Sequence, residues 1–470
     1  IITEHITDNK KDATQGMKDI KYTNTKHLEE IYSSHLDVLT NELDEAIKDT
    51  PFRHVIISSG TIKDRRMDDN PFPFKANPYF CRWLPLLEHP NCYLIYEVDK
   101  KPILIYFQEI DFWHKSAELP SSFWINYFDI IIVNSIDEIN THLPSNKKEC
   151  ILITDNYLED RYTFDMISIN PKNVINSINY GRSIKTEYEI ECLRKASRSA
   201  VRGHHVANNK FKEGASEFDI HMSYCKATKH SENELPYKNI IAINENASIL
   251  HYQHYQKQKI KNPRSFLIDA GASYNGYASD ISRTYANNCN EFQSLIDGID
   301  QMQQEIIDLI KIDMDYIELH IMAHEKIAEI IQQIGLANGS VESLVKNKIT
   351  DIFFPHGLGH FLGLQVHDVG GFLENSQGKE IIKSDRYPFL RLNRKIKENQ
   401  IFTIEPGLYV IDLLINKARI NGTYKMLNLK KIEWLKPYGG IRIEDNIRVL
   451  NKGIENLTRN AFDEGHMHDE

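Results

Sequence analysis

The stretch SFLIDAGASYNGYASDISRTY (residues 265–285) places two β-rich arms on either side of Asn275-Gly276. An Asn-Gly pair between such arms is the strongest short-range signal for a β-hairpin, because both residues tolerate the positive φ of a type I′ turn. We therefore predict a two-residue hairpin turn with Tyr274 facing Tyr277. This pairing fixes the register of the two strands.

Two aspartates of this hairpin are predicted to share one face. Asp280 would lie opposite Gly271, two residues from Asp269, so the carboxylates would be diagonal neighbours with backbones roughly 7–8 Å apart. Either aspartate alone is most simply explained as a solvated hairpin residue. Asp269, however, directly follows the apolar run 266–268, which should be buried. Since a buried, unpaired carboxylate is costly, we expect a cation or an arginine nearby.

Two glutamates lie in strand patterns further along the chain. Glu405 lies in IFTIEPG (401–407), and Glu444 lies in GGIRIEDN (439–446). A glutamate in such a pattern is usually on the solvent-facing side of an edge strand. Together with the aspartates and a histidine cluster, these glutamates form a set of four carboxylates and an imidazole. That set suits a hard-to-borderline divalent metal ion.

The histidine cluster lies in FFPHGLGHFLGLQVHD (353–368). His356 and His360 have the i, i+4 spacing of the helical zinc pair in H-E-x-x-H proteases. The glycines between them disfavour a helix, and the required glutamate after His356 is absent, so we reject that interpretation. Spacing alone leaves open whether His356, His360 or His367 is a metal ligand.

The ordered set of candidate ligands resembles that of the M24 metallopeptidases, which have the pita-bread fold. The matching residues are Asp269, Asp280, His360, Glu405 and Glu444. Within this group the chain is most similar to the bacterial Xaa-Pro dipeptidases, also called prolidases or organophosphorus acid anhydrolases, from about residue 23 onward. The similarity rests on DDNPFPFKANPYF (68–80), NENASILHY (244–252), PHGLGHFLGLQVHDVGGF (355–372), FTIEPGLYVID (402–412) and KPYGGIRIEDNI (436–447).

The resemblance implies a catalytic role for several residues. His360 would be the metal-binding histidine, and Glu405 would transfer protons in addition to binding metal. The residues that would surround the substrate and stabilise the tetrahedral intermediate are His251, His356 and His367. Without the resemblance, His251 would be interpreted as a hydrogen-bonded core histidine.

The resemblance also implies three substrate-binding residues. Arg391 would hold the free carboxylate of a dipeptide, Tyr237 would line the pocket, and Asp69 would be contributed across a homodimer interface. From the residues alone, Arg391 would be interpreted as an ordinary surface arginine.

The implied reaction hydrolyses Xaa-Pro dipeptides to a free amino acid and proline. Two divalent metal ions per subunit, bridged by Asp280 and Glu444, would hold a hydroxide that attacks the carbonyl before proline. Because most ligands are oxygens, Mn²⁺ is preferred, with Co²⁺ or Zn²⁺ as alternatives. The same hydroxide could attack phosphorus, so a side activity on organophosphate triesters is expected.

Other interpretations compete with this one. A catalytically inactive pita-bread domain used as a binding module, or a metal-free creatinase-like enzyme, would lack ligands that are all present here. Aminopeptidase P shares the ligands and the preference for proline. Arg391 and the segment LQVHDVGG (364–371) favour dipeptides over longer substrates, so we expect a dipeptidase.

The composition of the 470-residue chain excludes several functions. A formal net charge of -10, without a basic run, argues against a nucleic-acid-binding protein. The six cysteines are scattered, which is typical of reduced thiols in a cytoplasmic protein. No apolar run approaches the roughly 18 residues of a membrane span, so we expect no membrane partner.

We predict an α+β protein with two domains and a polar N-terminal tail over 1–22. A smaller mixed α/β domain, over 23–175, would serve dimerisation and form the rim of the active site, and the pita-bread catalytic domain would follow over 176–470. The first domain is expected to begin with a helix over 26–48, followed by five strands. These strands are predicted in the runs 54–59, 92–98, 101–107, 129–135 and 150–156.

Four further segments are singled out by their residue patterns. Thr186 and Glu189 have the spacing of a capping box at the start of a helix. Two long helices are expected at about 291–311 and 315–334, the second ended by Gly335. The segment 67–80 is predicted as a Pro- and aromatic-rich loop. A longer insertion at about 411–433 could reshape the rim of the site.

Overall fold

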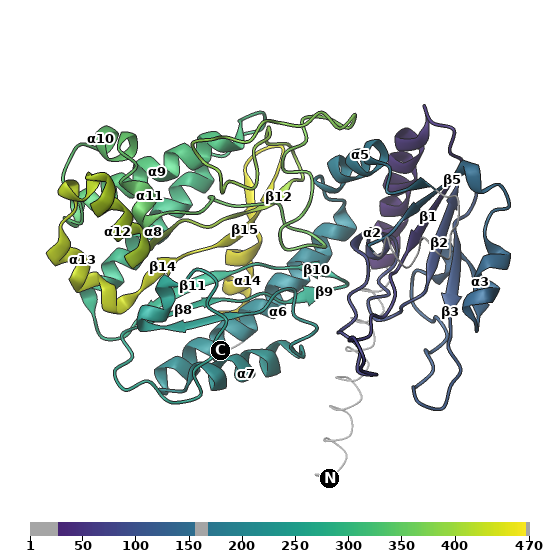
Figure 1. The fold of residues 1–470 in the computed structure, drawn as a ribbon, viewed down its shortest axis with the longest axis horizontal. Coiled ribbons are helices and arrows are strands. Elements are labelled where there is room, and N and C mark those ends of the chain that lie inside the picture. Colours follow the sequence, from purple (N-terminus) through teal and green to yellow (C-terminus); the bar gives the residue numbers. More distant parts are fainter. Residues whose placement is uncertain (1–26, 156–167, 467–470) are drawn as a thin grey trace, which may run out of the picture. The chain divides into compact units, whose positions relative to one another are not determined.

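The computed structural model describes residues 27–155 and 168–466; the predicted tail over 1–22 lies outside them. The chain divides into two compact units (Figure 1). The first runs up to Ile178 and includes Thr186–Tyr188, and the second consists of Asn179–Lys185 and the chain from Glu189 onward. The domain boundary expected near residue 175 lies close to this division. Among the described residues, no helix combines the length and apolar character of a membrane span.

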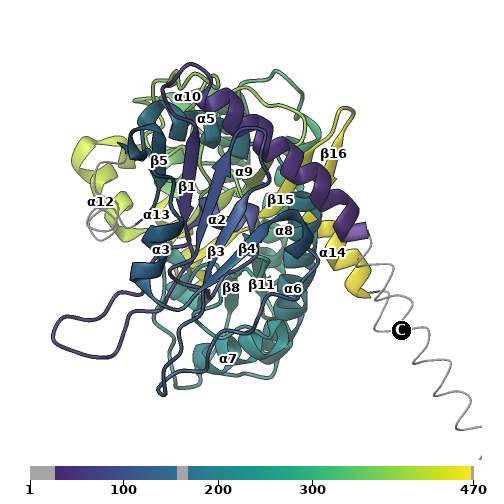
Figure 2. The same cartoon turned by 90° about the vertical axis from the view of Figure 1, so that its right-hand side faces the viewer.

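The first unit is built on a six-stranded mixed sheet with the order β4-β3-β2-β1-β5-β6 (Figure 2). Strands β1 and β2, and β2 and β3, pair antiparallel, whereas β1 with β5, β3 with β4 and β5 with β6 pair parallel. The strands are β1 (His54–Ser58), β2 (Tyr93–Glu97), β3 (Ile103–Phe107), β4 (Asp129–Val133), β5 (Cys150–Ile153) and β6 (Ser168–Ile169). The five predicted strand runs are therefore confirmed.

The helices of the first unit match the sequence prediction except in one place. The helix over 27–47 confirms the predicted helix, and most of its apolar side chains are buried. The predicted loop over 67–80 is wrong at its end, where α2 (Pro78–Trp83) begins. The Asn77 side chain accepts a hydrogen bond from the Tyr79 N–H and Pro78 occupies the first helical turn, which are two preferred helix-start features. The other helices are α3 (Ile136–His142) and α5 (Lys172–Arg182), whose residues from Asn179 onward belong to the second unit.

The second unit contains four small sheets and most of the helices. Its strands are β7 (Ile240–Ile243), β8 (Ser265–Asp269), β9 (Ser273–Tyr274), β10 (Tyr277–Ala278), β11 (Ser282–Ala286), β12 (Ile401–Ile404), β13 (Gly407–Tyr409), β14 (Gly440–Arg442), β15 (Asp445–Val449) and β16 (Ile454–Asn456). Its helices are α6 (Glu187–Lys212), α7 (Glu217–Thr228), α8 (Asn290–Asp308), α9 (Tyr316–Gln333), α10 (Val341–Lys346), α11 (Thr350–Phe353), α12 (Asp412–Asn421), α13 (Leu429–Leu435) and α14 (Leu457–His466). The two predicted long helices correspond to α8 and α9.

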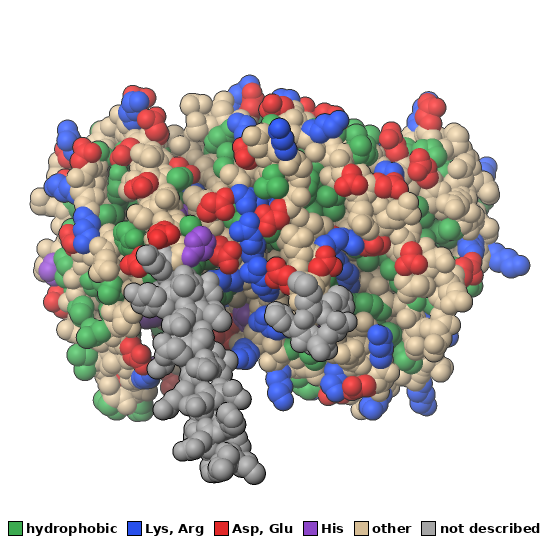
Figure 3. Space-filling model, turned by 180° about the vertical axis from the view of Figure 1, so that it is seen from behind, with side chains coloured by type: hydrophobic (Ala, Val, Ile, Leu, Met, Phe, Trp, Pro, Cys, Tyr) green, Lys and Arg blue, Asp and Glu red, His purple; other side chains and the backbone are tan. Residues whose placement is uncertain are grey.

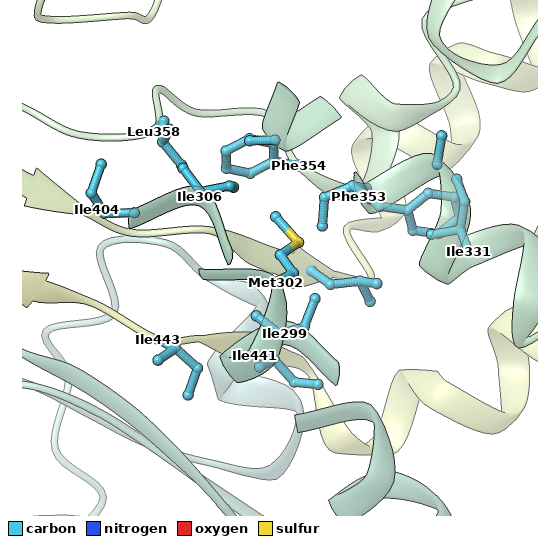
Figure 4. Packing of buried hydrophobic residues seen from close by; sticks show 14 of the residues in the cluster. Ile299, Met302, Ile306, Ile331, Phe353, Phe354, Leu358, Ile404, Ile441 and Ile443 are labelled. Carbon is cyan, nitrogen blue, oxygen red and sulfur yellow. The ribbon is translucent and has the colours of Figure 1, made fainter. Parts of the chain in front are cut away.

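Each half of this unit packs a helix pair against a sheet. Helices α6 and α7 bury apolar residues against β7 and β8. Helices α8 and α9 do the same in the larger core, where Met302 and Ile306 of α8 lie near Ile404 of β12 and Ile441 of β14 (Figure 4). In each half, the helices therefore cover one face of the sheet. Polar side chains of the strands lie on the opposite face, where the two halves can contribute to one site. On the face drawn in Figure 3, acidic and basic side chains are interspersed, as the near balance of 56 basic and 66 acidic residues leads us to expect.

The predicted register of the aspartate hairpin is confirmed. Tyr274 pairs with Tyr277, and both turn residues have positive φ, 50° for Asn275 and 86° for Gly276. The register continues without a slip into β8 and β11, where Ser282 pairs with Asp269. Because the strands stay in register through the turn, Asp269 and Asp280 are diagonal neighbours.

Buried neutral histidines in the second unit predict a loss of stability in acid. Burial lowers the pKa of His324 to about 4 from 6.5, and its Nδ1 lies 2.8 Å from Thr350 Oγ1. Between these two pH values the unfolded chain binds a proton that the folded chain does not, so stability present above pH 6.5 falls as the pH drops towards 4. The expected loss from this site is on the order of 3 kcal/mol.

Urea unfolding at pH 7 and pH 5 checks this prediction. The His324→Gln variant should lose less free energy of unfolding between the two pH values than the wild type. His254→Gln, at an exposed histidine of the same unit, should keep the wild-type difference. An equal pH-dependent loss in His324→Gln and the wild type would contradict the assignment.

Candidate metal centre

The two aspartates of the hairpin share a tyrosine hydroxyl. Tyr237 Oη lies 2.8 Å from Asp269 Oδ1 and 2.7 Å from Asp280 Oδ1. The second oxygen of Asp269 accepts a hydrogen bond from Arg442 Nη2 at 2.7 Å. The arginine expected from the buried aspartate is therefore Arg442. Sequence reasoning did not name it, although it lies two residues before Glu444 in the same strand pattern and so faces the same side.

Glu444 lies where the two halves of the second unit meet. Strands β11 and β14 lie side by side (Figure 1), and the Glu444 N–H donates to the Ser282 carbonyl at 3.1 Å. The Ser282 hydroxyl in turn donates to Glu444 Oε2 at 2.8 Å. Since Ser282 pairs with Asp269, this junction brings the glutamate of one sheet beside the aspartates of the other.

His360 lies on a segment outside the named strands whose backbone pairs with β12. The Thr403 N–H donates to the His360 carbonyl at 2.9 Å, and the Glu405 N–H donates to the Leu358 carbonyl at 2.8 Å. Between them, a Cβ at position 359 would lie 1.9 Å from the Thr403 carbonyl oxygen, so only glycine allows this close pairing. The glycines between the histidines therefore serve tight backbone packing. The pairing places His360 beside Glu405.

The His360 ring faces three carboxylates. Its Nδ1 lies 3.0 Å from the Phe361 carbonyl oxygen, which can only accept, so Nδ1 carries the proton and Nε2 is left as the metal-binding atom. Nε2 lies 3.4 Å from Asp280 Oδ2, 3.6 Å from Glu405 Oε1 and 4.0 Å from Glu444 Oε1. Asp280, His360 and Glu444 all offer ligand atoms within 4.8 Å of one another.

The electrostatics of this cluster fit a cation. Burial raises the pKa of Asp269 to about 6 and of Glu405 to about 7, and it raises the pKa of Glu444 well above its usual range. Burial also acts to raise the pKa of Asp280, but the hydrogen bond and the charge of His360 outweigh it and hold this pKa below the usual value. Asp280 and Glu444 are buried, and Asp269 and Glu405 are partly buried. Carboxylates this close together with few positive neighbours take up protons unless cations bind in place of those protons. The donor set therefore matches one or more divalent metal ions.

Two further histidines of the cluster differ in their partners. His356 Nδ1 lies 2.8 Å from the Gly357 carbonyl oxygen and its Nε2 lies 2.9 Å from Tyr409 Oη, so both ring nitrogens are engaged. The His367 ring lies 4.3 Å from the His360 ring at an angle of 78°. Burial lowers the pKa of His356 to about 3 and of His367 to about 4, so both are neutral at pH 7.

The remaining candidate residues lie at the edge of the cluster or in the other unit. Arg391 and His251 are exposed, and the charge of Arg391 adds to burial in lowering the pKa of His367. Asp69 is exposed on a loop of the first unit. Its relation to the metal-ligand cluster stays a prediction.

Two family models match the chain. The model described as "Xaa-Pro dipeptidase, N-terminal domain" matches residues 30–180. "Metallopeptidase family M24" matches residues 191–451, which contain all five candidate metal ligands.

Curated relatives and solved structures agree with these matches. The Xaa-Pro dipeptidase of Aeromonas hydrophila is 44% identical over 92% of this chain and 98% of its own length. The Xaa-Pro dipeptidase of Shewanella oneidensis is 44% identical with the same coverage. Aminopeptidase P of Escherichia coli, solved with the inhibitor Pro-Leu, has a TM-score of 0.69 at 21% identity, over 90% of this chain and 94% of that one. This structural similarity supports the pita-bread fold.

Proposed function

Because the chain belongs to metallopeptidase family M24, we propose that it is a Xaa-Pro dipeptidase, which releases a free amino acid and proline. The observation that carries the proposal is the convergence of Asp280, His360, Glu405 and Glu444 in one buried cluster beside Asp269. Relatives that are 44% identical over almost their whole length are named Xaa-Pro dipeptidases.

We propose that two divalent metal ions per subunit bind at this cluster, with Mn²⁺ preferred over Co²⁺ and Zn²⁺. Four of the five proposed ligands are carboxylates, which favours a hard cation. Asp280, His360 and Glu444, which lie in one group, would hold metal together with Asp269 and Glu405. When bound, the ions would polarise the scissile carbonyl and lower the pKa of water enough to form a nucleophile at neutral pH.

Glu405 is proposed to transfer the proton. It would accept the proton released when the nucleophile forms and deliver it to the proline nitrogen, which carries no hydrogen in an Xaa-Pro bond. Its Oε1 lies 3.6 Å from His360 Nε2, so the carboxylate lies within the cluster where the nucleophile would form. A carboxylate at this position is suited both to accept and to return a proton.

Of the half-buried His356 and the exposed His367, His367 is the better placed to donate to a developing oxyanion. The ring nitrogens of His356 are both engaged, whereas no hydrogen bond to the His367 ring is found within residues 27–155 and 168–466. A neutral imidazole retains one N–H that can donate to the substrate. His356 is proposed to act with Tyr409, and His251 to line the substrate site.

Arg391 is proposed to hold the free carboxylate of the dipeptide, which makes substrate length the test of the proposed function. A guanidinium binds a carboxylate through two parallel hydrogen bonds, worth about 1.5–3 kcal/mol each. We expect efficient hydrolysis of Ala-Pro, and Arg391→Ala should raise KM for Ala-Pro by roughly 10- to 100-fold. Steady-state kinetics measures both effects.

A matched control separates this effect from a general loss of surface charge. Arg419→Ala, on α12 and also exposed, should leave KM unchanged. Faster turnover of Ala-Pro-Ala than of Ala-Pro would favour an aminopeptidase P activity instead. Turnover of neither peptide by the metal-loaded protein would overturn the proposed function.

The remaining proposals concern assembly, location and a second substrate. We propose a homodimer, with Tyr237 near the substrate and Asp69 contributed to the site of the other subunit. Hydrolysis of organophosphate triesters is proposed as a side activity, because the same nucleophile could attack phosphorus. None of the six cysteines, all within the described residues, forms a disulfide, which supports the proposal that the protein works in the reducing cytoplasm.

A further inference from the structure

Asp368 ends the histidine-rich stretch over 353–368 and has no part in the proposed function. Its Oδ1 accepts a hydrogen bond from Arg182 Nη2 at 2.7 Å, and its Oδ2 accepts one from Lys185 Nζ at 2.8 Å. The side chains of all three residues are only 1% exposed. Three charged groups are therefore held together away from water, in a cluster that we call the Asp368 clamp.

The stability that such a cluster provides does not explain its presence. Moving charges out of water is costly, and well-packed apolar residues of similar volume are often equally or more stabilising. What a buried ion cluster does provide is a fixed geometry, since each charge must stay against its partner. The question is which part of the molecule the Asp368 clamp holds in place.

The clamp closes the loop over 361–368 into a compact unit. The Asp368 N–H donates to the Phe361 carbonyl at 2.9 Å, and Arg182 Nη2 also donates to Gln365 Oε1 at 3.3 Å. A Cβ at Gly363 would lie 2.1 Å from Asp368 Oδ2, so the clamped carboxylate occupies the space beside this glycine. Gly363 also links the loop to the aspartate hairpin, because its carbonyl accepts a hydrogen bond from the N–H of Ala278, two residues before Asp280.

His367 depends on this loop for its position. Its ring lies 4.3 Å from that of His360, but we find no hydrogen bond to the His367 ring in the described part of the chain. The residue after it is Asp368, whose backbone and side chain are both fixed. The backbone on either side of the clamp therefore determines where the His367 ring lies.

We propose that Asp368 is a positioning residue: held by Arg182 and Lys185, it fixes the loop over 361–368 so that His367 is kept beside His360 for catalysis. This inference rests on the proposed function, in which His367 stabilises the developing oxyanion. Loss of the clamp should lower kcat more than it raises KM, because a misplaced donor weakens the transition state selectively.

A double-mutant cycle with His367→Ala tests the proposal. Asp368→Asn should lower kcat for Ala-Pro roughly 10- to 100-fold in the wild-type background, but by less than about twofold when His367 is already alanine. The matched control is Glu455→Gln, whose carboxylate is likewise held by two cations, Arg194 and Arg448, but which has no contact with the loop. It should change kcat by less than about twofold.

A second clamp variant and hydrogen exchange of the loop complete the test. If Asp368→Asn fails to fold, Lys185→Met, which leaves the Arg182 partner in place, enters the same cycle. Hydrogen exchange of the 361–368 peptide, measured on metal-free protein, should be faster in the clamp variant and unchanged in Glu455→Gln, whether or not the protein cleaves Xaa-Pro. Equal losses of kcat with and without His367, or unchanged exchange, would overturn the proposal.

Discussion

The Asp280→Asn variant is expected to lose about 10³-fold or more in kcat/KM for Ala-Pro, since metal-ion stabilisation of a transition state is worth several kcal/mol. Asp280 is central to the cluster, because one oxygen bonds Tyr237 and the other lies 3.4 Å from His360 Nε2. The amide keeps the shape of the side chain but removes its charge. Metal content should fall together with activity, as measured by mass spectrometry of the purified protein.

A carboxylate outside the cluster provides the matched control. Asp300 accepts a hydrogen bond from Arg459 Nη2 at 2.6 Å and makes no contact with the proposed ligands. Asp300→Asn should keep metal content and keep kcat/KM within about threefold of the wild type. If Asp280→Asn retained full metal content and activity, the assignment of Asp280 as a ligand would be wrong.

Removal of metal is expected to abolish hydrolysis of Ala-Pro, and Mn²⁺ should restore it better than Co²⁺ or Zn²⁺. Arg442, a positively charged side chain of this cluster, is already bonded to Asp269 and Tyr409, so polarisation of the scissile carbonyl is assigned to the metal ions. The measurement is activity after dialysis against a chelator, followed by titration with each metal ion. Full activity after exhaustive metal removal would refute the two-metal proposal.

The same titration should change the stability of the protein. A metal ion present at 100 times its dissociation constant would add about 2.7 kcal/mol to the free energy of unfolding. Mn²⁺ should therefore raise the thermal midpoint of the wild type. In Asp280→Asn the rise should be lost, and in Asp300→Asn it should remain. A rise of equal size in all three proteins would indicate binding elsewhere.

Much of the second unit could be predicted because its decisive signals are local. The Asn275-Gly276 turn fixes a register that extends from Tyr274 to Asp269. The same locality explains why the strand runs and long helices were predictable. The start of α2 was missed, although Asn77-Pro78 is a recognised helix start, because the surrounding prolines suggested a loop.

Long-range polar contacts could not be predicted in the same way. The partner of Asp269 was expected to be an arginine, but its identity as Arg442 depends on how two sheets meet at Ser282 and Glu444. The Asp368 clamp also joins residues far apart in the chain, since Arg182 and Lys185 precede Asp368 by more than 180 positions. No local pattern in the sequence specifies such contacts.

Anomalous diffraction from crystals of the Mn²⁺-loaded protein would test the central claim most directly. The proposed function requires two anomalous peaks per chain, both among the side chains of Asp269, Asp280, His360, Glu405 and Glu444. The described residues contain a second group of potential ligands, the partly exposed Glu109, Asp111 and His114 of the first unit. Peaks only at that group, or none at the five proposed ligands, would contradict a metallopeptidase centre here.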